Sequence, residues 1–566
     1  MYKRLIWILF LILSGLILIY PVHLEPVFYT IQGVHIFQSL TTFCIIFIIW
    51  FILLLFLILK GNQTEQVFAL CAFGLIFLGF WVLKTPYGGT SDSIFNFGHV
   101  AYIEKTGHII FNHPNLVYFE FPVLHIEGAT VSEICGISVT TMSVLFLMFN
   151  SLLFVISLYL LFQSLLKNSL QACLAVLFTI IASVVLPQEF RIFYPRTLSY
   201  SLLCLFLFVL IKALKFRYQP YAIILVLLIS VMILEYFPVP ALLILILISM
   251  FLVTIINHTF SKNGYDQLPI ILIFFVVGFI SWELYVATNM FGNILSMGQS
   301  FSNNISSMEF FSIKLLATST LGIVPLWAKI TRITSWILLL LAGVLIWLIT
   351  LFKIKRISYE ETFLVAGLCG TGLLEIFSIL GSQSGIEFAR FLLYAPFFCA
   401  PLVVKYFADN SRKYFAIIIS IILFCLSLPS FLSSVHLIAT DAWYPSEYAA
   451  GATLSEITIS SNTRGFYLGS GAIPWVYYFP DSEQTTTPRI NTETQLRQYT
   501  KDIVTQFEEY PNNAYFTWSE RALTPYENVF QIKPDDILWK DTYNTLNLTD
   551  RIYDNGTVEI YYNQVN

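Results

Sequence analysis

The chain has 566 residues, of which 57% are hydrophobic and only 11% are charged, and its mean hydropathy is +0.76. This composition excludes an ordinary soluble globular protein and indicates a membrane protein with many spanning segments. The formal net charge of −4 is unevenly distributed. Residues 433–566 hold 17 acidic against 8 basic residues, a net charge of −9, so the preceding residues carry +5. An acidic, water-exposed tail therefore follows a basic membrane body.

Thirteen apolar stretches are long enough to be predicted as membrane spans, since a helix needs about 20 apolar residues to cross about 30 Å of hydrocarbon. The first follows Lys3 and Arg4 like a signal peptide, but it lacks a small-x-small cleavage site and is therefore predicted to remain as a span. The predicted spans are 4–20, 37–59, 67–84, 141–166, 170–186, 198–214, 220–236, 239–256, 267–288, 333–352, 361–380, 391–407 and 414–432.

The basic residues predict the orientation of these spans, because Lys and Arg in short loops are retained in the cytoplasm. With the N-terminus inside, the short inner loops collect most of them: Lys60, Lys167, Lys212, Lys215, Arg217, Lys262, Lys353, Lys355, Arg356, Lys405, Arg412 and Lys413. An odd number of spans then places the acidic tail outside. The main outward exceptions are Lys84, Lys105, Arg191, Arg196, Lys314, Lys329, Arg332 and Arg390.

The eight cysteines all precede the tail, and seven fall inside apolar segments, where they resemble small hydrophobic residues. No disulfide framework or CxxC metal site is predicted.

The outward loops on this topology are 85–140, 187–197, 289–332 and 381–390. In the first loop, Ile94, Phe97, Val100, Ala101 and Ile103 recur at near-helical spacing, which predicts a helix lying along the interface. Asn96, His99 and Glu104 are expected on its opposite side. The loop 289–332 has a similar pattern.

Asp92 stands in "GTSDSIF", just after the third span. It is expected either to cap the helix that follows, where its side chain would accept backbone N–H bonds, or to act chemically. The two roles are compatible, because a capped carboxylate is also rigidly oriented.

Two further outward segments contain arginine at the mouth of a helix. "LPQEFRIFYPRTLSY" supplies Glu189, Arg191 and Arg196, and "GSQSGIEFARFLLY" supplies Glu387 and Arg390. The alternative role for these arginines is a local ion pair or a position at the level of the lipid headgroups.

Three glutamates, Glu235, Glu283 and Glu375, lie within predicted spans just below the outward surface. Each would cost about 2.5–3.5 kcal/mol at the bilayer centre, so they should face protein or water. They are expected either to pair with the arginines or to line a polar cavity, together with Glu104, His113 and Glu387.

A carboxylate near arginines suits transfer of a group from a phosphate to a hydroxyl or amide. The carboxylate would take the proton of the acceptor, which typically contributes about 10²–10⁴-fold, and the arginines would neutralise the departing phosphate. No G-x-G-x-x-G or Walker sequence is present for a nucleotide, which favours a lipid-anchored donor.

These segments resemble the GT-C glycosyltransferases. "GGTSDSIFNFGHVAYIEKTGHI" and "FEFPVLHIEGATVSEICGIS" are similar to the first large outward loop of that family, and "ARFLLYAPFF" is similar to its late arginine segment. The resemblance covers approximately residues 67–432. It implies a polyprenyl-phosphate-linked sugar as donor, with Asp92 as catalytic base and Arg390 at the donor phosphate, and Arg196 and Arg191 are assigned to the same role.

"QEFRIFYPR" resembles the polar motif of the second loop, so Glu189 would share a divalent metal, Mg or Mn, with Asp92 in metal-dependent members. Two features depart from the family. The tail lacks the WWDYG sequence of oligosaccharyltransferases, and Asp92 is followed by Ser93 where protein O-mannosyltransferases have Glu. These departures argue against transfer of a whole glycan to asparagine, and they leave the acceptor and the metal requirement open.

The predicted organisation is an α-helical polytopic membrane domain over 1–432 and a small α/β extracytoplasmic domain over 433–566. "TRGFYLGSGAIPWVYYF" and "DNGTVEIYYN" are typical of strands, an Asn555–Gly556 turn precedes the last strand, and a helix is expected after Pro445.

The function favoured by the sequence is a glycosyltransferase of the cell membrane. Its partners would be the lipid-linked donor, membrane lipids and an extracytoplasmic protein or glycan acceptor, without nucleic acid. The alternatives are a transporter or flippase of polyprenyl-linked glycans and a non-enzymatic surface-anchored protein. The concentration of unusual polar residues on one side disfavours transport, and thirteen spans exceed the needs of an anchor.

Overall fold

The structure is a computed structural model of the 566-residue chain. It describes residues 2–20, 41–84, 91–109, 120–183, 186–216, 219–256, 267–292, 294–296, 299, 326–352, 357–381, 394–410, 414–441, 464–467, 514–519, 550–554 and 558–563.

Helices dominate the described residues up to 441. Their bounds are α1 Tyr2–Ile19, α4 Thr41–Lys60, α5 Gln63–Phe77, α6 Phe80–Lys84, α7 Ser91–Thr106, α8 Val123–Cys135, α9 Val139–Leu165, α10 Ser169–Ala182, α11 Leu186–Glu189, α12 Pro195–Phe216, α13 Gln219–Glu235, α14 Pro238–Ile256, α15 Leu268–Tyr285, α18 Leu326–Leu351, α19 Tyr359–Gly381, α21 Pro396–Asn410 and α22 Phe415–Asp441.

Every predicted span contains a helix, so the helical membrane architecture expected from the sequence is confirmed in outline. Six of the described helices are long and apolar enough to cross a membrane: Thr41–Lys60, Gln63–Lys84, Val139–Leu165, Pro195–Phe216, Pro238–Ile256 and Leu268–Tyr285. Shorter apolar helical stretches occur at Ser169–Ala182, Pro220–Glu235, Ile337–Leu351 and Ala416–Leu432. The figure of thirteen crossings stays a prediction.

Two helix ends differ from the predicted spans. Helix α22 continues to Asp441, past residue 432, and α18 begins at Leu326, before residue 333. The third predicted span consists of two helices, α5 and α6, which are separated at Leu78 and Gly79. The two longer helices extend beyond their predicted spans because a helix can continue into polar surroundings, whereas hydropathy marks only its apolar part.

Local sequence signals set several helix starts. Asn62 and Glu65 form a reciprocal capping box before α5, Ser138 accepts a hydrogen bond from the Thr141 N–H at the start of α9, and Asn168 does the same for Gln171 at α10. Gly136 ends α8 in the left-handed conformation, with a φ of 62°, which glycine adopts without steric strain.

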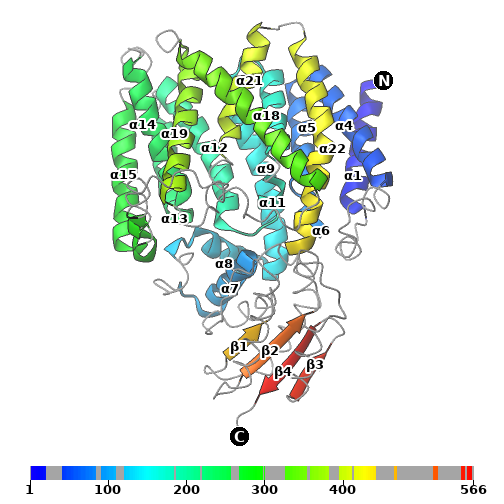
Figure 1. Cartoon of the computed structure of the whole chain (residues 1–566), viewed down its shortest axis with the longest axis vertical. Coiled ribbons are helices and arrows are strands. Elements are labelled where there is room, and N and C mark those ends of the chain that lie inside the picture. Colours follow the sequence, from blue (N-terminus) through cyan, green and yellow to red (C-terminus); the bar gives the residue numbers. More distant parts are fainter. Residues whose placement is uncertain are drawn as a thin grey trace.

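The helices form one bundle, with α7 and α8 beneath it at one end and the N-terminus at the other (Figure 1). Between α4, α5, α6 and α22 the core is aromatic. Phe431 of α22 lies 5.0 Å from Phe47, 5.3 Å from Trp81 and 5.5 Å from Phe77, measured between ring centroids. Such pairs add to the stabilisation that burial provides.

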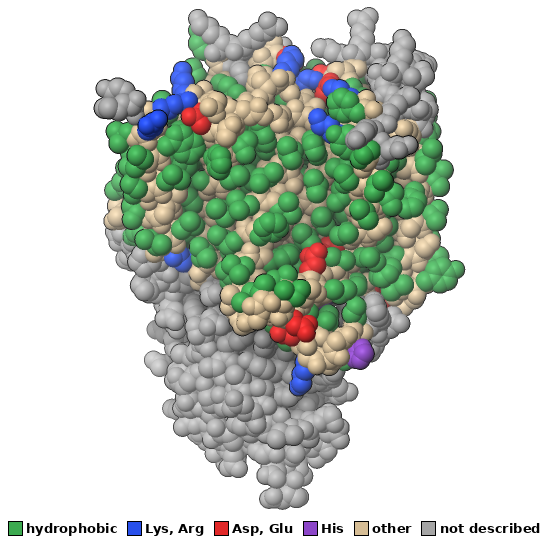
Figure 2. Space-filling view, turned by 180° about the vertical axis from the view of Figure 1, so that it is seen from behind, with side chains coloured by type: hydrophobic (Ala, Val, Ile, Leu, Met, Phe, Trp, Pro, Cys, Tyr) green, Lys and Arg blue, Asp and Glu red, His purple; other side chains and the backbone are tan. Residues whose placement is uncertain are grey.

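The flank of the bundle is a band of apolar side chains, whereas the basic side chains visible on this face gather mostly at the end opposite α7 and α8 (Figure 2). On α15, for example, Ile273 is 62% exposed and Val277 is 59% exposed. Exposed apolar surface on this scale requires a lipid environment, so the chain is a multi-pass membrane protein.

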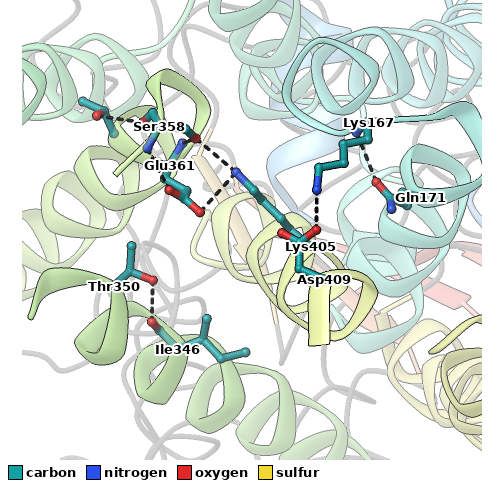
Figure 3. A network of polar contacts seen from close by, with 9 residues as sticks. Lys167, Gln171, Ile346, Thr350, Ser358, Glu361, Lys405 and Asp409 are labelled. Carbon is teal, nitrogen blue, oxygen red and sulfur yellow. Dashed lines mark hydrogen bonds and ion pairs between the residues drawn. The ribbon is translucent and has the colours of Figure 1, made fainter. Parts of the chain in front are cut away.

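At the end of the bundle that carries the basic side chains, polar contacts join α10, α19 and α21 (Figure 3). Lys405 of α21 lies 3.3 Å from Glu361 and donates to the Ser358 hydroxyl at 3.2 Å. Four residues later, Asp409 pairs with Lys167, which precedes α10. These contacts hold the C-terminal part of α21 at this end of the bundle. The first residue of α21 lies at the other end of that helix.

Beyond α22, four strands form one sheet in the order β1-β2-β4-β3: β1 Arg464–Tyr467, β2 Ala514–Ser519, β3 Asp550–Asp554 and β4 Val558–Asn563. β1 pairs parallel with β2, and the other pairs are antiparallel. The sheet lies beyond α7 and α8 in Figure 1. Strands were predicted at β1 and β4, while the predicted helix after Pro445 and the Asn555–Gly556 turn lie outside the described residues.

Candidate functional site

The second polar loop of the sequence forms a compact turn between two helices. Helix α11 ends at Glu189, and α12 begins at Pro195. Proline suits a first helical position because its fixed φ is helical and its missing N–H would have no partner there. Arg191 is fully buried in this turn, and Arg196 is 9% exposed.

Side-chain hydrogen bonds from α9 and from α12 itself hold this turn in place. The Asn150 amide of α9 donates to the Thr197 carbonyl at 2.8 Å and accepts from the Ser201 hydroxyl at 2.6 Å. The Thr197 hydroxyl in turn contacts the carbonyls of Ile192, at 2.8 Å, and Glu189, at 3.1 Å. These bonds satisfy backbone groups that a buried turn would otherwise leave unpaired.

Glu189 and Arg196 form a buried ion pair. Arg196 Nη2 lies 2.5 Å from Glu189 Oε2, and the two side chains are about equally buried, at 9% and 10% exposure. The guanidinium of Arg196 also stacks 5.2 Å from the ring centroid of Tyr194, a cation–π contact. This ion pair is the alternative to phosphate binding that the sequence left open for Arg196. One carboxylate cannot accept all five N–H groups of a guanidinium.

Two further tyrosines border this pair. Tyr200, four residues into α12 from Arg196, has its ring 5.4 Å from that of Tyr394, which precedes α21. Both interact electrostatically with Glu189 and Arg196. Tyr236 follows α13, and its ring lies 5.8 Å from that of Tyr194. The cluster thus joins α11, α12, α13 and the segment before α21.

Helix α7 is attached to the same turn through Asn96. The Asn96 amide donates to the Phe193 carbonyl at 3.1 Å, and its Oδ1 accepts from His125 Nε2 of α8 at 2.7 Å. This pattern places the His125 proton on Nε2. Burial lowers the pKa of His125 to about 4, so its ring is neutral near pH 7.

Asp92 lies in the first turn of α7, which begins at Ser91. It stands one helical turn before Asn96, about 6 Å along the axis. The Asn96 contact therefore brings the start of α7 to the turn that contains Arg191 and Arg196. The side chain of Asp92 is outside the described part of the structure.

Two polar residues that were expected opposite the apolar side of the interface helix are buried. Asn96 and His99 are only 1% and 5% exposed. The reason is that α7 packs against α8, α9 and the Phe193 turn, so that its polar side is enclosed and hydrogen-bonded. Glu104 is exposed and accepts from the Ser132 hydroxyl at 3.3 Å.

Arg390, Glu387 and His113 lie outside the described residues.

The three glutamates predicted within spans are buried. Glu235, Glu283 and Glu375 are 0%, 2% and 8% exposed, and among the described residues none of their carboxylate oxygens has a hydrogen-bond partner. Ionisable groups of this kind inside a membrane protein are candidate functional residues. Glu235 is near Glu127 of α8, and Glu283 is near Glu120.

Glu120 connects the two long loops that the sequence predicts to face outward. Its two carboxylate oxygens accept the backbone N–H groups of Asn289 and Met290, each at 2.9 Å. Two such bonds to one buried carboxylate stabilise its charge. The first loop is therefore fixed to the start of the segment that follows α15.

The residues do not fit the divalent metal that the family resemblance implies at Glu189. Its carboxylate already contacts the Arg196 guanidinium, whose positive charge would repel a cation. Within the described ranges there is also no group of three or more His, Cys, Asp or Glu side chains that could hold a metal ion. No chemical step is therefore assigned to a metal.

Comparison with family models and with curated proteins finds no match. Solved structures with a similar path of the chain include ArnT from Cupriavidus metallidurans bound to undecaprenyl phosphate, at 11% identity and a TM-score of 0.48, covering 88% of this chain and 98% of that one. The apo state of the same protein matches at 13% identity and a TM-score of 0.42, with the same coverage. The arabinofuranosyltransferase AftD from Mycobacteria matches at 12% identity and a TM-score of 0.48, over 89% of this chain and 42% of that one. Because these identities and TM-scores are low, the assignment of the site rests on this chain's own residues.

Several residues of the site carried no signal in the sequence. His125, Tyr200 and Tyr394 are ordinary polar and aromatic residues in apolar surroundings, and only their tertiary neighbours identify them. Of these residues, Tyr394 is the closest in sequence to a segment that was singled out, because it directly follows "ARFLL".

Proposed function

We propose that the protein is a membrane glycosyltransferase that moves a sugar from a polyprenyl-phosphate donor to an acceptor outside the cytoplasm. The observation that carries the proposal is the buried cluster of Glu189, Arg196 and tyrosines, to which Asn96 attaches the helix that contains Asp92. Buried arginine at one end of an apolar bundle suits a phosphate that is anchored by a lipid chain.

Each group in the proposed reaction has one role. The acceptor oxygen or nitrogen attacks the anomeric carbon of the donor sugar, and Asp92 takes the proton of the acceptor. The bond between the anomeric carbon and the phosphate oxygen breaks, and its electron pair leaves with polyprenyl phosphate. Arg196, together with Arg191 and Arg390 from the neighbouring segments, would stabilise the charge that accumulates on this phosphate.

The position of the cluster supports a lipid donor. The arginine lies in the first turn of a membrane-length helix, where a phosphate at the headgroup level can reach it while the polyprenyl chain remains in hydrocarbon. The basic side chains gather at the opposite end of the bundle, as the positive-inside rule predicts when the cluster faces outward. The acceptor and the identity of the sugar follow from neither observation.

The proposal is tested with purified protein in lipid vesicles, a panel of polyprenyl-phosphate sugars and a panel of acceptor proteins and glycans, with mass spectrometry of the released lipid and of the acceptor. We expect sugar-dependent release of polyprenyl phosphate by the natural protein and none by Asp92→Asn. Glu133→Gln is the matched control, because Glu133 is an exposed carboxylate on the adjacent helix α8 with no role in the proposed reaction, and it should retain activity. Movement of labelled lipid across the membrane without release would favour a flippase instead.

A further inference from the structure

Glu120 replaces a helix cap that the local sequence lacks. Residues 288–292 form a short helix, and its first backbone hydrogen bond is accepted by the Ala287 carbonyl. Ala287 therefore occupies the N-cap position, where a Ser, Thr, Asn or Asp side chain would accept the N–H groups two and three residues later. Alanine has no such acceptor. Those N–H groups belong to Asn289 and Met290, and Glu120 accepts both of them.

This long-range cap is enclosed by protein. Glu120 is 0% exposed, so water cannot replace it as the acceptor for the two N–H groups, and losing it would leave buried groups unsatisfied. Glu283 interacts with Glu120, yet both of its carboxylate oxygens lack a hydrogen-bond partner among the described residues. Of these two neighbouring carboxylates, Glu120 is therefore the one that holds the segment after α15.

The link from Glu120 to α8 is short and has little backbone freedom. Phe121 is 4% exposed, and Pro122 follows it at the N-cap position of α8. The ring of Pro122 fixes its own φ, here −86°, and also restricts the residue before it. Pro122 provides no side-chain cap. The position of the first turn of α8 thus depends on Glu120 and on the helices that α8 contacts.

Helix α8 is joined to α7 on one face. His125 Nε2 donates to Asn96 Oδ1 at 2.7 Å. About one turn later, a Cβ atom at Gly128 would lie only 2.8 Å from Cγ2 of Val100, so the absence of a side chain lets the two helices approach closely. The two helices should therefore move as one unit, and Asp92 in the first turn of α7 should move with them.

We propose that Glu120 is a positioning residue for Asp92. By capping residues 288–292 it fixes α8, and through α8 the start of α7, against the end of α15. This inference rests on the proposed function, in which Asp92 takes the proton of the acceptor. It adds a residue that controls this step without touching the substrate. Donor binding should not depend on Glu120, because the turn that contains Arg196 is held by α9 and α12.

The test uses Glu120→Gln, which keeps the size of the side chain but turns an NH₂ group toward one of the two N–H groups. Hydrogen exchange of the purified full-length protein is measured by mass spectrometry, together with the transfer rate and the binding of decaprenyl phosphate. Gly128→Val breaks the second link of the chain, between α8 and α7. Glu133→Gln is the matched control, because Glu133 is an exposed carboxylate of α8.

In Glu120→Gln, hydrogen exchange should become about tenfold faster or more, both at residues 289–290 and at residues 95–99 of α7, because the local opening that permits exchange becomes easier. Residues 199–203 of α12 should remain protected. The transfer rate should fall about tenfold or more, since a small displacement of a catalytic group is costly, while the affinity for decaprenyl phosphate is unchanged.

Gly128→Val should accelerate exchange in α7 but not at residues 289–290, and it should also lower the transfer rate. Glu133→Gln should change none of these quantities.

Faster exchange confined to residues 289–290, with transfer at the natural rate, would overturn the inference, because α8 would then not transmit the effect of Glu120. Faster exchange throughout the chain, α12 included, would show a general loss of stability and would also overturn it. A natural protein that transfers no sugar from any donor would overturn the proposed function, whereas the exchange pattern alone still decides whether Glu120 fixes the start of α7.

Discussion

The buried ion pair between Glu189 and Arg196 should be strongly coupled. Glu189→Gln removes the charge that compensates a guanidinium with only 10% exposure, and breaking a buried pair costs about 3–5 kcal/mol. Arg196→Met leaves the carboxylate without a cation and should cost a similar amount. Replacing both together removes both buried charges and should cost about 1 kcal/mol or less, because well-packed neutral groups substitute for buried pairs at little cost.

The assay is reversible unfolding of the purified protein in mixed micelles, run as a double-mutant cycle. The expected coupling energy is at least about 2 kcal/mol. The matched control is the pair Lys3 and Glu65, which has a similar separation of 2.6 Å but side-chain exposures of 47% and 20%. Exposed pairs contribute about 0.2–1 kcal/mol, so Glu65→Gln should fall in that range. A coupling for Glu189 and Arg196 no larger than that of the control would refute the buried cluster.

Three further predictions concern other contacts. Because the pKa of His125 is about 4, the unfolded chain binds a proton between pH 6.5 and 4 that the folded chain does not. The free energy of unfolding should therefore decrease as the pH is lowered through that window, by about 2 kcal/mol at pH 5. His125→Gln should remove this dependence in unfolding measurements. Asn96→Ala removes two buried hydrogen bonds, so it should destabilise the protein by about 1–3 kcal/mol. It should also lower the transfer rate while the affinity for decaprenyl phosphate is unchanged. An unchanged transfer rate would contradict the role of Asn96 in positioning α7. Lys405→Met breaks the contact with Glu361 at the opposite end, so it should cost about 1 kcal/mol and leave transfer unaffected, and a large loss of activity would show coupling between the ends.

The helices were predictable because their signals are local. A run of apolar residues of membrane length, a capping residue such as Ser138 and a glycine such as Gly136 act within a few residues of themselves. The helix after Asp92 was predicted from the same kind of local spacing, and α7 occupies that segment.

The burial of polar residues was not predictable in the same way. Asn96 contacts Phe193, which is 97 residues away in the sequence, and Tyr200 packs on Tyr394, which is 194 residues later. Helical periodicity identifies the two sides of a helix, but it cannot say that a second helix and a turn will enclose the polar side. The arginine of the second loop was recognised because charge is rare in this chain, whereas its tyrosine neighbours are common residues.

Glu120 shows the same limit. The sequence gives no reason to single it out from other loop glutamates, and its role depends on two N–H groups about 170 residues later. Contacts of this kind arise from how the loops meet at the end of the bundle next to α7 and α8, which no local pattern encodes.

The most direct measurement of the central claim is an experimental structure of the protein with decaprenyl phosphate bound. We expect the phosphate beside Arg196, with the Asp92 carboxylate facing the same space. A phosphate bound at the end where Lys405 lies, or an Asp92 side chain directed away from the phosphate, would contradict the proposed reaction.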